Sequence, residues 1–218
     1  MKISMGPPAI EIDDVGVHRD GGWVMRDFSL AVEPGRKVAL TGPYGCGKST
    51  LLGCILGFVR ADAGRVVVDG SEVNAHSVWT LRRRIGYVAQ EPDPGRGTVD
   101  EVLARAFHYR ANRSLAGNLE RVPAWMERLG LALTLRKKAV ADLSGGEKQR
   151  IALMAALLLE RDILLLDEIT SALDRERRAS VLQILRECPA TMLIVSHDEA
   201  VFAMSDHVVE MRPPEPSS

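Results

Sequence analysis

The sequence has few cysteines and no long hydrophobic run. None of its three cysteines forms a C-x-x-C pair, so we expect reduced thiols in the cytosol rather than disulfides or a zinc site. The longest uninterrupted apolar segment, Ile151–Leu159, has about half the length that a bilayer-spanning helix needs. The N-terminal residues contain no long apolar stretch of the kind found in a secretory signal. If the protein serves a membrane, we expect another chain to span it.

An excess of charge of one sign is also missing. Lys and Arg number 28 against 29 Asp and Glu, which gives a formal net charge of −1. No electrostatic feature therefore points to a nucleic-acid partner. Charged residues make up 26% and hydrophobic residues 46% of the chain, the composition of an ordinary globular protein.

Short apolar runs alternate with helical patterns along the chain. The first two predicted strands are joined by "RDGG" and are expected to pair antiparallel, whereas later runs such as "ILLL" indicate a buried parallel sheet. The pattern between Pro92 and Val140 is helical throughout, so we expect an α/β fold with a helical insert. The predicted strands are Ala9–Val17, Val24–Val32, Lys37–Thr41, Arg65–Val68, Ile85–Ala89, Ile163–Leu166, Thr191–Val195 and Val208–Met211. The predicted helices are Lys48–Leu56, Val99–Ala111, Leu119–Leu129, Glu147–Leu159, Arg175–Glu187 and Glu199–Met204.

A glycine-rich segment, "GPYGCGKST" at 42–50, follows one predicted strand and precedes an apolar helical run. It matches the pattern G-x-x-x-x-G-K-[ST] in the strand-to-helix context that this pattern requires. Backbone N–H groups of such a loop turn toward phosphate oxygens, and the helix N-terminus adds partial positive charge. We expect Lys48 to reach the β- and γ-phosphates and Ser49 to ligate Mg²⁺. The loop residues expected to bind the nucleotide are Gly42, Pro43, Tyr44, Gly45, Cys46, Gly47, Lys48, Ser49 and Thr50.

Polar side chains follow several apolar strands at the edge where α/β sheets bind ligands. Two carboxylates close "ILLLDE" at 163–168. Asp167 is placed to hold the magnesium shell, and Glu168 to orient or deprotonate an attacking water. Gln90 and His197 each close another strand and are expected at the same edge. A lone glutamine or histidine there is more often a loop residue, but its coincidence with a phosphate loop favours a site.

A second anion-binding pattern is "LSGGEKQR" at 143–150. The spacing of Ser144 and Glu147 predicts that Ser144 caps the following helix. Gly145 and Gly146 leave backbone N–H groups at its positive end. Capping-box spacing alone is weak evidence, because "TVDE" at 98–101 and "SALD" at 171–174 share it.

Together these segments resemble the ATP-binding subunit of ABC transporters. The similarity extends from about Ile10 to Arg212. "GPYGCGKST" matches the phosphate loop of the family, "LSGGEKQR" its signature, "ILLLDE" its second nucleotide motif and "SALD" its dimer-facing loop. Gln90 matches the glutamine loop and His197 the switch histidine. The signature is highly specific, because other P-loop classes lack it.

The resemblance implies an ATPase with a P-loop NTPase core, a parallel sheet, an N-terminal antiparallel β subdomain and a helical insert. ATP and Mg²⁺ are the implied cofactors. The implied catalytic residues are Glu168, His197, Lys48 and Gln90, and the implied metal residues are Ser49, Gln90 and Asp167. Further residues implied at the nucleotide are Ser144, Gly145, Gly146, Glu147 and Asp174, together with Gln90 and His197.

Family members stack adenine on an aromatic residue of the N-terminal hairpin. Counting back from "MRDFSL" reaches His18, with Trp23 expected in the turn, so His18 is the first choice for this role. The signature of the family grips the γ-phosphate of ATP held by the other subunit. The resemblance therefore implies a dimer of two ATPase subunits around two ATP molecules, a homodimer in the simplest case.

The resemblance also implies a separate integral membrane permease subunit and no nucleic-acid partner. The chain is then expected on the cytoplasmic face of the cell membrane, with the segment Glu91–Val102 receiving a short cytoplasmic helix of the permease. We expect a single domain over 1–218. Its core is predicted at about 9–91 and 141–212, its helical subdomain at about 92–140, and a disordered tail at 213–218.

The branch of the family is predicted from a short motif. "DEITSALD" has Ile169 where most relatives carry proline, which resembles ATPases of the iron-export type. ATPases for amino acids, phosphonate or lipoproteins, and non-transport ABC ATPases, remain alternatives. A chromosome or repair ATPase of this superfamily would need a long heptad insertion or zinc modules. A translation factor would need two cassettes in one chain, and a GTPase would need an N/T-K-x-D motif that binds guanine. The sequence has none of these features.

Overall fold

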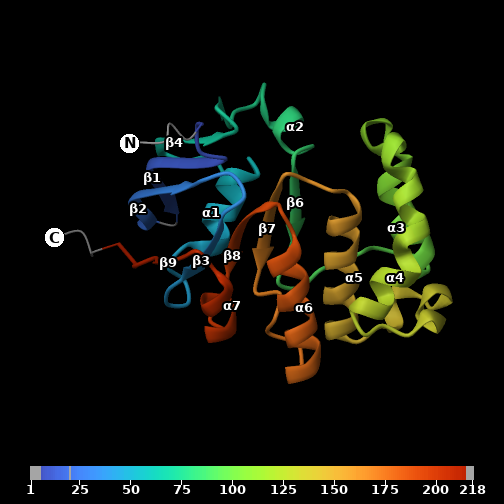
Figure 1. Cartoon of the computed structure of the whole chain (residues 1–218). Helices are drawn as coiled ribbons and strands as arrows, with labels where there is room; N and C mark the ends of the chain where they lie inside the picture. Colours follow the sequence, from blue (N-terminus) through green and yellow to red (C-terminus); the bar gives the residue numbers. More distant parts are fainter. Residues whose placement is uncertain (1–5, 20, 215–218) are drawn as a thin grey trace.

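The computed structural model describes residues 6–19 and 21–214, whose strands form two sheets (Figure 1). The antiparallel sheet has the order β2-β1-β4-β5, and the parallel sheet has the order β6-β7-β8-β3-β9. The antiparallel strands are β1 (Ile10–Arg19), β2 (Gly22–Val32), β4 (Ala63–Val68) and β5 (Ser71–Glu72). The parallel strands are β3 (Lys37–Thr41), β6 (Ile85–Val88), β7 (Ile163–Asp167), β8 (Thr191–Val195) and β9 (His207–Glu210).

Alternate residues of β7 enter two separate hydrophobic clusters, because successive side chains of a strand point to opposite faces. Ile163 and Leu165 pack with α1 (Lys48–Ile55) and the antiparallel sheet. Leu164 and Leu166 pack with the helices on the other face. Both faces of the parallel sheet are therefore buried, which explains its uninterrupted apolar runs.

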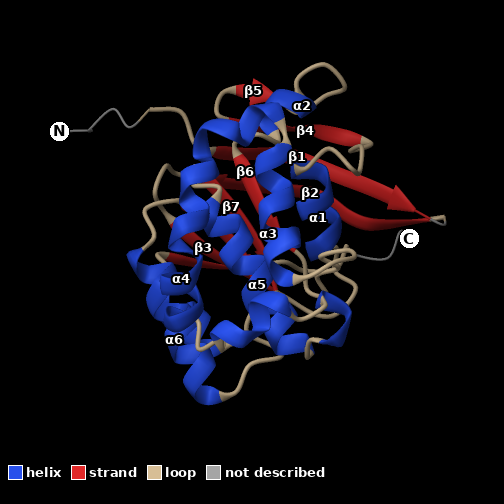
Figure 2. Ribbon diagram, turned by 90° about the vertical axis from the view of Figure 1, so that its right-hand side faces the viewer, coloured by secondary structure: helices blue, strands red, loops and turns tan. Residues whose placement is uncertain are grey.

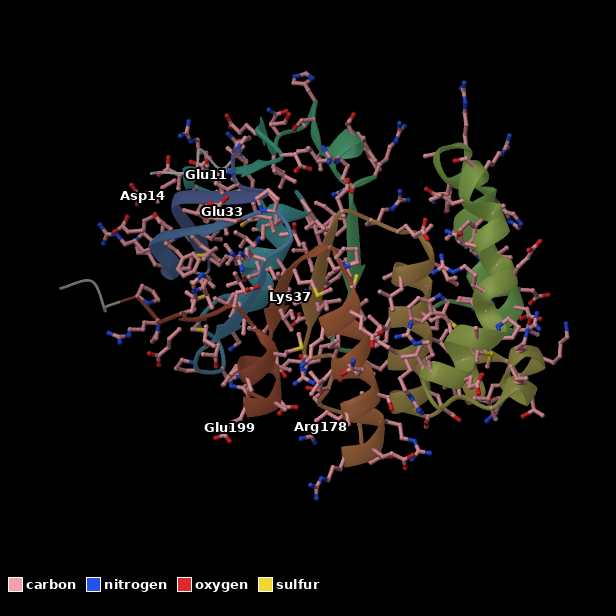
Figure 3. All side chains as sticks on the ribbon, in the orientation of Figure 1. Glu11, Asp14, Glu33, Lys37, Arg178 and Glu199 are labelled. Atoms are coloured by element: carbon pink, nitrogen blue, oxygen red, sulfur yellow. The ribbon has the colours of Figure 1, made fainter. Side chains whose placement is uncertain are left out.

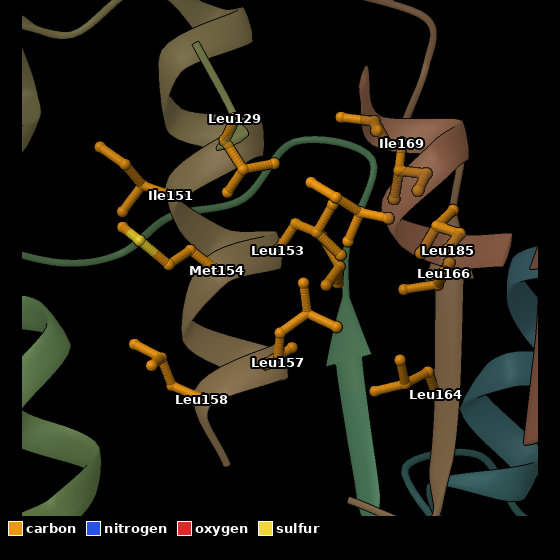
Figure 4. Close-up of a cluster of buried hydrophobic side chains, with 14 of the residues drawn as sticks. Leu129, Ile151, Leu153, Met154, Leu157, Leu158, Leu164, Leu166, Ile169 and Leu185 are labelled. Atoms are coloured by element: carbon orange, nitrogen blue, oxygen red, sulfur yellow. The ribbon is translucent and has the colours of Figure 1, made fainter. Parts of the chain in front are cut away.

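The helix α5 (Gly145–Leu158) packs between the parallel sheet and the outer helices. Figure 4 shows Leu153 and Leu157 pointing toward the parallel sheet, where β6 is the nearest strand, while Ile151 and Leu158 point to the opposite side. All four side chains are buried, and each buried leucine or isoleucine contributes about 1.5–3 kcal/mol. Burial on both sides fixes α5, and with it the signature segment at its N-terminus.

The remaining helices cover the α5 face of the sheet or connect strands (Figure 2). Figure 3 shows charged side chains over the outside, with Arg178 and Glu199 labelled beside the lower ends of two of these helices. The helices are α2 (Val78–Leu81), α3 (Val99–His108), α4 (Val122–Arg128), α6 (Arg175–Glu187) and α7 (Glu199–Met204), and 3-10 turns occupy Arg110–Arg121, Leu133–Lys137 and Val140–Asp142.

The observed elements match the predicted order, and four details are corrected. The helix predicted at Leu119–Leu129 begins only at Val122, because Pro123 cannot donate a backbone hydrogen bond and is tolerated only in the first turn. The helix predicted at Val99–Ala111 ends at His108, since Tyr109 has extended backbone angles. Trp23 lies in β2 opposite His18 rather than in the turn. The signature helix begins at Gly145, directly after its cap, rather than at Glu147.

Two small elements, β5 and α2, have no counterpart in the prediction. Within the described residues, no helix is long and apolar enough to cross a bilayer. The subdomain limits near 92 and 140 stay predictions. Of the predicted tail at 213–218, residues 215–218 lie outside the described part of the chain.

Candidate active site

The phosphate loop turns between β3 and α1 on glycines with positive φ. Gly42 has a φ of 144°, and a Cβ there would lie 2.1 Å from the carbonyl oxygen of Met211. Gly47 has a φ of 98° and packs against the backbone of Val24 in β2. Only glycine fits both positions without strain. The loop therefore lies between Met211, which directly follows β9, and the N-terminal hairpin.

Lys48 is buried, and its ammonium group turns back into the loop. Its Nζ donates to the carbonyl oxygens of Gly42 at 2.6 Å and Pro43 at 2.9 Å. The buried Sγ of Cys46 lies 3.8 Å from the same Nζ. The loop carbonyls therefore fix the lysine charge at the centre of the phosphate loop, where the sequence predicts it.

Ser49 and Asp167 meet although 118 residues separate them. The hydroxyl of Ser49 donates to the Oδ2 of Asp167 at 3.1 Å. Burial raises the pKa of Asp167, while the Ser49 hydrogen bond and the nearby Lys48 lower it. Hydroxyl and carboxylate oxygens are the ligands that Mg²⁺ uses beside substrate phosphates, so this pair fits the predicted cation.

Glu168 lies one step beyond Asp167 in the left-handed backbone region, with a φ of 49°. This conformation is uncommon outside glycine and clusters at functional sites. Its Oε1 lies 3.5 Å from the Nε2 of His197, which follows β8. Burial is the main cause that raises the pKa of Glu168, and His197 counteracts it. A raised pKa suits a carboxylate that must take a proton near neutral pH.

The turn that carries His197 is held on its far side by the neighbouring helix. Asp198 caps α7 by accepting from the backbone N–H of Ala200 at 2.9 Å. Its other oxygen lies 3.4 Å from the Nε of Arg178 on α6. This ion pair ties the histidine turn to α6.

Ser144 caps α5, as the sequence predicts. Its hydroxyl accepts from the backbone N–H of Glu147 at 3.3 Å, and the carboxylate of Glu147 accepts from the backbone N–H of Ser144 at 2.8 Å. The hydrogen bonds that this carboxylate accepts from the backbone N–H and from the hydroxyl of Ser144 lower the pKa of Glu147. Thr98 forms the same capping box on α3, so the motif by itself does not mark a ligand site.

The two signature glycines have different surroundings. A Cβ on Gly145 would meet no atom within 4 Å, whereas a Cβ on Gly146 would lie 2.9 Å from the carbonyl oxygen of Ala172. Gly146 is therefore needed for packing against the loop 171–174 of the same chain. The backbone of Gly145 is open to a ligand from outside the chain.

The other predicted residues lie at the expected edge or at its periphery. Gln90 follows β6 and is exposed, beside the strand that carries Asp167. The carboxylate of Asp174 caps α6 by accepting from the backbone N–H of Arg177 at 2.9 Å. His18 is exposed near the end of β1, with its ring 5.4 Å from that of Trp23 in an edge-on arrangement. Nucleotide contacts of these residues stay predictions.

The prediction omitted two buried residues of the signature helix. The Nε2 of Gln149 donates to the carbonyl of Ala89 at 3.2 Å, next to Gln90. Arg150 donates to the carbonyls of Leu129 at 3.0 Å and Gly130 at 3.1 Å. The "QR" that follows the signature therefore connects α5 to β6 and α4. Their sequence context did not indicate this role, because the pair directly follows the polar residues Glu147 and Lys148 and resembles an exposed polar stretch.

Comparisons with known proteins decide the family. The family model described as ABC transporter matches residues 25–171, more than half of the chain. The chain belongs to the ABC transporter family. Its members are ATPases, and the chain is accordingly an ATP-binding and ATP-hydrolysing subunit.

Two relatives and one solved structure show how close the similarity is. The energy-coupling factor transporter ATP-binding protein of Enterococcus faecalis is 35% identical over 94% of this chain and 76% of its own length. The probable iron export ATP-binding protein of Escherichia coli is 31% identical over 94% of this chain and 92% of its own length. A dimeric ATP-binding cassette in a post-hydrolysis state, bound to ADP and Pi, is 25% identical with a TM-score of 0.82, over 93% of this chain and 94% of that one.

Proposed function

We propose that two copies of this ABC ATPase close on two ATP molecules and drive a separate membrane subunit from the cytoplasmic side. The observation that carries the proposal is the arrangement at the carboxyl edge of the sheet. Ser49 and Asp167 meet there, and Glu168 stands 3.5 Å from His197. The open backbone at Gly145 supports a ligand shared with a second chain, and the similar solved cassette is a dimer.

Each residue has a distinct part in the proposed hydrolysis. Lys48 and the loop N–H groups hold the β- and γ-phosphates. Glu168 takes the proton of the attacking water, and His197 holds that carboxylate in place. A magnesium ion held by Ser49 and Asp167, with Gln90 nearby, would neutralise charge on the phosphate oxygens.

The proposed membrane partner has a candidate contact surface, which we call the aromatic patch and define as Phe58, Trp79 and Arg82. The two rings are 68% and 70% exposed. The guanidinium of Arg82 lies 4.1 Å from the Phe58 ring centroid and 5.0 Å from that of Trp79. Its Nε donates to the carbonyl of Leu56 at 2.8 Å, which holds the group in place. A preformed apolar surface beside a cation fits an apolar segment with acidic residues.

We expect the double variant Phe58→Ser/Trp79→Ser to lose the membrane subunit. The test co-expresses this chain with a candidate multi-span membrane protein from the same genome and purifies the complex in detergent. Burying each ring is worth about 1.5–3 kcal/mol, so the double variant should retain less than about a tenth of the membrane subunit. Tyr109→Ser removes an exposed aromatic ring elsewhere and serves as the control. Equal recovery with the double variant and the control would contradict a role of the patch.

We further propose that the cargo is iron and the direction is export. The motif "DEITSALD" with Ile169 supports this branch, and so does the similarity to the probable iron export ATP-binding protein over 92% of its length. We expect deletion of the gene to sensitise cells to excess iron or oxidative stress, with rescue by the native gene but not by Glu168→Gln. Unchanged iron tolerance with a defect for an amino acid, phosphonate or lipoprotein would assign another branch.

A further inference from the structure

Tyr44 is the most exposed large hydrophobic residue in the described part of the chain, with a relative exposure of 103%. It lies in the phosphate loop between Pro43 and Gly45, and Gly45 has a φ of 81°. The loop binds phosphate with backbone N–H groups, so the ring is not needed for that purpose. An uncovered aromatic ring forgoes the roughly 1.5–3 kcal/mol that burial would supply. This side chain therefore lacks a structural role within its own chain.

A groove of about 690 Å³ borders the open signature glycine. Its lining residues include Ala141, Gly145, Lys148, Ser171 and Ala172, and we call the part of the groove formed by these five the signature groove. Ala141 and Ala172 supply apolar surface, and Lys148 and Ser171 supply polar groups. This mixture suits a tyrosine, which has an apolar ring and a polar tip.

We propose that Tyr44 of one copy inserts into the signature groove of a second copy when two chains close on ATP. The inference rests on the proposed ATP-bound dimer. In that dimer, the phosphate loop of one chain and Gly145 of the other approach the same γ-phosphate. Tyr44 belongs to that loop, and that glycine is one of the residues that line the groove, so the ring and the groove lie on facing surfaces.

The two-fold symmetry of the proposed dimer would form the Tyr44 contact twice. A dimer of identical chains with a two-fold axis uses the same patch on both copies, so two Tyr44 rings enter two grooves. Tyrosine is among the residues whose truncation most often costs more than a factor of ten in binding. Tyr44 is thus a specificity-determining residue for self-association, in addition to the backbone contacts of its loop.

The first test measures dimer dissociation by sedimentation in the Glu168→Gln background, with ATP saturating for each variant by its own measured affinity. Tyr44→Ala should raise the dissociation constant roughly tenfold to hundredfold. Tyr44→Phe keeps the ring and should stay within about threefold. Tyr109→Ala removes another exposed ring from the surface and serves as the matched control. An unchanged constant in Tyr44→Ala overturns the contact but leaves the ATP dimer standing, whereas a monomeric Glu168→Gln parent overturns both.

The second test places a cross-link across the proposed contact. Tyr44→Cys and Ala172→Cys are combined with Cys188→Ser, which removes the only native thiol that is not buried. A short bis-maleimide cross-linker should join the copies with ATP and not without it, because a ring that reaches the groove keeps the two Cβ atoms about one tyrosine side chain apart, which is too far for a direct disulfide. Tyr109→Cys paired with Ala172→Cys should give no linked dimer. Failure of the Tyr44→Cys pair to link in a variant that still dimerises overturns the placement.

Discussion

Glu168→Gln is expected to slow ATP hydrolysis by ~10²–10⁴-fold, the usual effect of losing a positioned general base. The amide keeps the shape of the side chain but cannot take the proton of water. ATP binding should survive, because Lys48 and Ser49 are unchanged. ATP then stays intact between two chains, and mass action shifts the population toward dimer. The variant should therefore elute as a monomer without nucleotide and as a dimer with ATP.

Glu160→Gln is the matched control, because it makes the same chemical change at another left-handed glutamate, which is exposed and pairs with Arg121 at 2.5 Å. It should hydrolyse ATP at close to the native rate. A Glu168→Gln protein that hydrolyses as fast as this control would show that Glu168 only closes a turn.

Ser144→Arg, added to Glu168→Gln, tests the composite site itself. The long side chain would occupy the space where the γ-phosphate must approach, so the ATP-bound dimer should disappear. Thr98→Arg removes the same kind of cap from α3 and controls for the roughly 1 kcal/mol that a lost cap costs. An ATP-dependent dimer that survives Ser144→Arg would count against a γ-phosphate shared between signature and phosphate loop.

The parallel sheet was predictable because its strands are buried on both faces and therefore lack polar interruptions. Lys37–Thr41 and Thr191–Val195 have the predicted bounds for this reason. The bounds of α6 were predicted correctly, and Asp174 caps its start, whereas the start of α5 was predicted two residues late although its cap Ser144 was predicted. Helix limits were also wrong in the helical insert, where Pro123 and the extended Tyr109 override a continuous helical pattern.

The edge of the sheet that holds the candidate site was predictable, but the contacts across it were not. Parallel strands bring Asp167 and His197 to one edge by topology alone. The 3.1 Å contact between Ser49 and Asp167 depends on how α1 packs on the sheet. No local sequence pattern predicts that packing. Gln149 likewise bonds to Ala89, 60 residues away. The nucleotide contacts of His18 and Asp174 stay predictions.

The approach of β9 to the phosphate loop is another feature that the sequence does not show, and it sets the last expectation. Gly42→Ala should lower the kcat/KM for ATP on the order of 10²-fold, the scale of an ångström-sized misplacement. The added Cβ would lie 2.1 Å from the carbonyl oxygen of Met211. Met211 cannot retreat easily, because its N–H donates to the carbonyl of Thr41 at 2.7 Å. The loop must therefore move, and Lys48, whose Nζ bonds to the Gly42 carbonyl, moves with it.

Gly45→Ala separates this clash from backbone strain. Gly45 also has a positive φ, 81°, but a Cβ there would meet nothing within 4 Å. Its alanine variant bears only the conformational cost of roughly 1 kcal/mol, about a fivefold effect. Both variants should be assayed well below their own unfolding temperatures, with ATP affinity measured beside turnover. Losses of equal size in the two variants would show that strain alone acts at Gly42 and that β9 does not set the position of the phosphate loop.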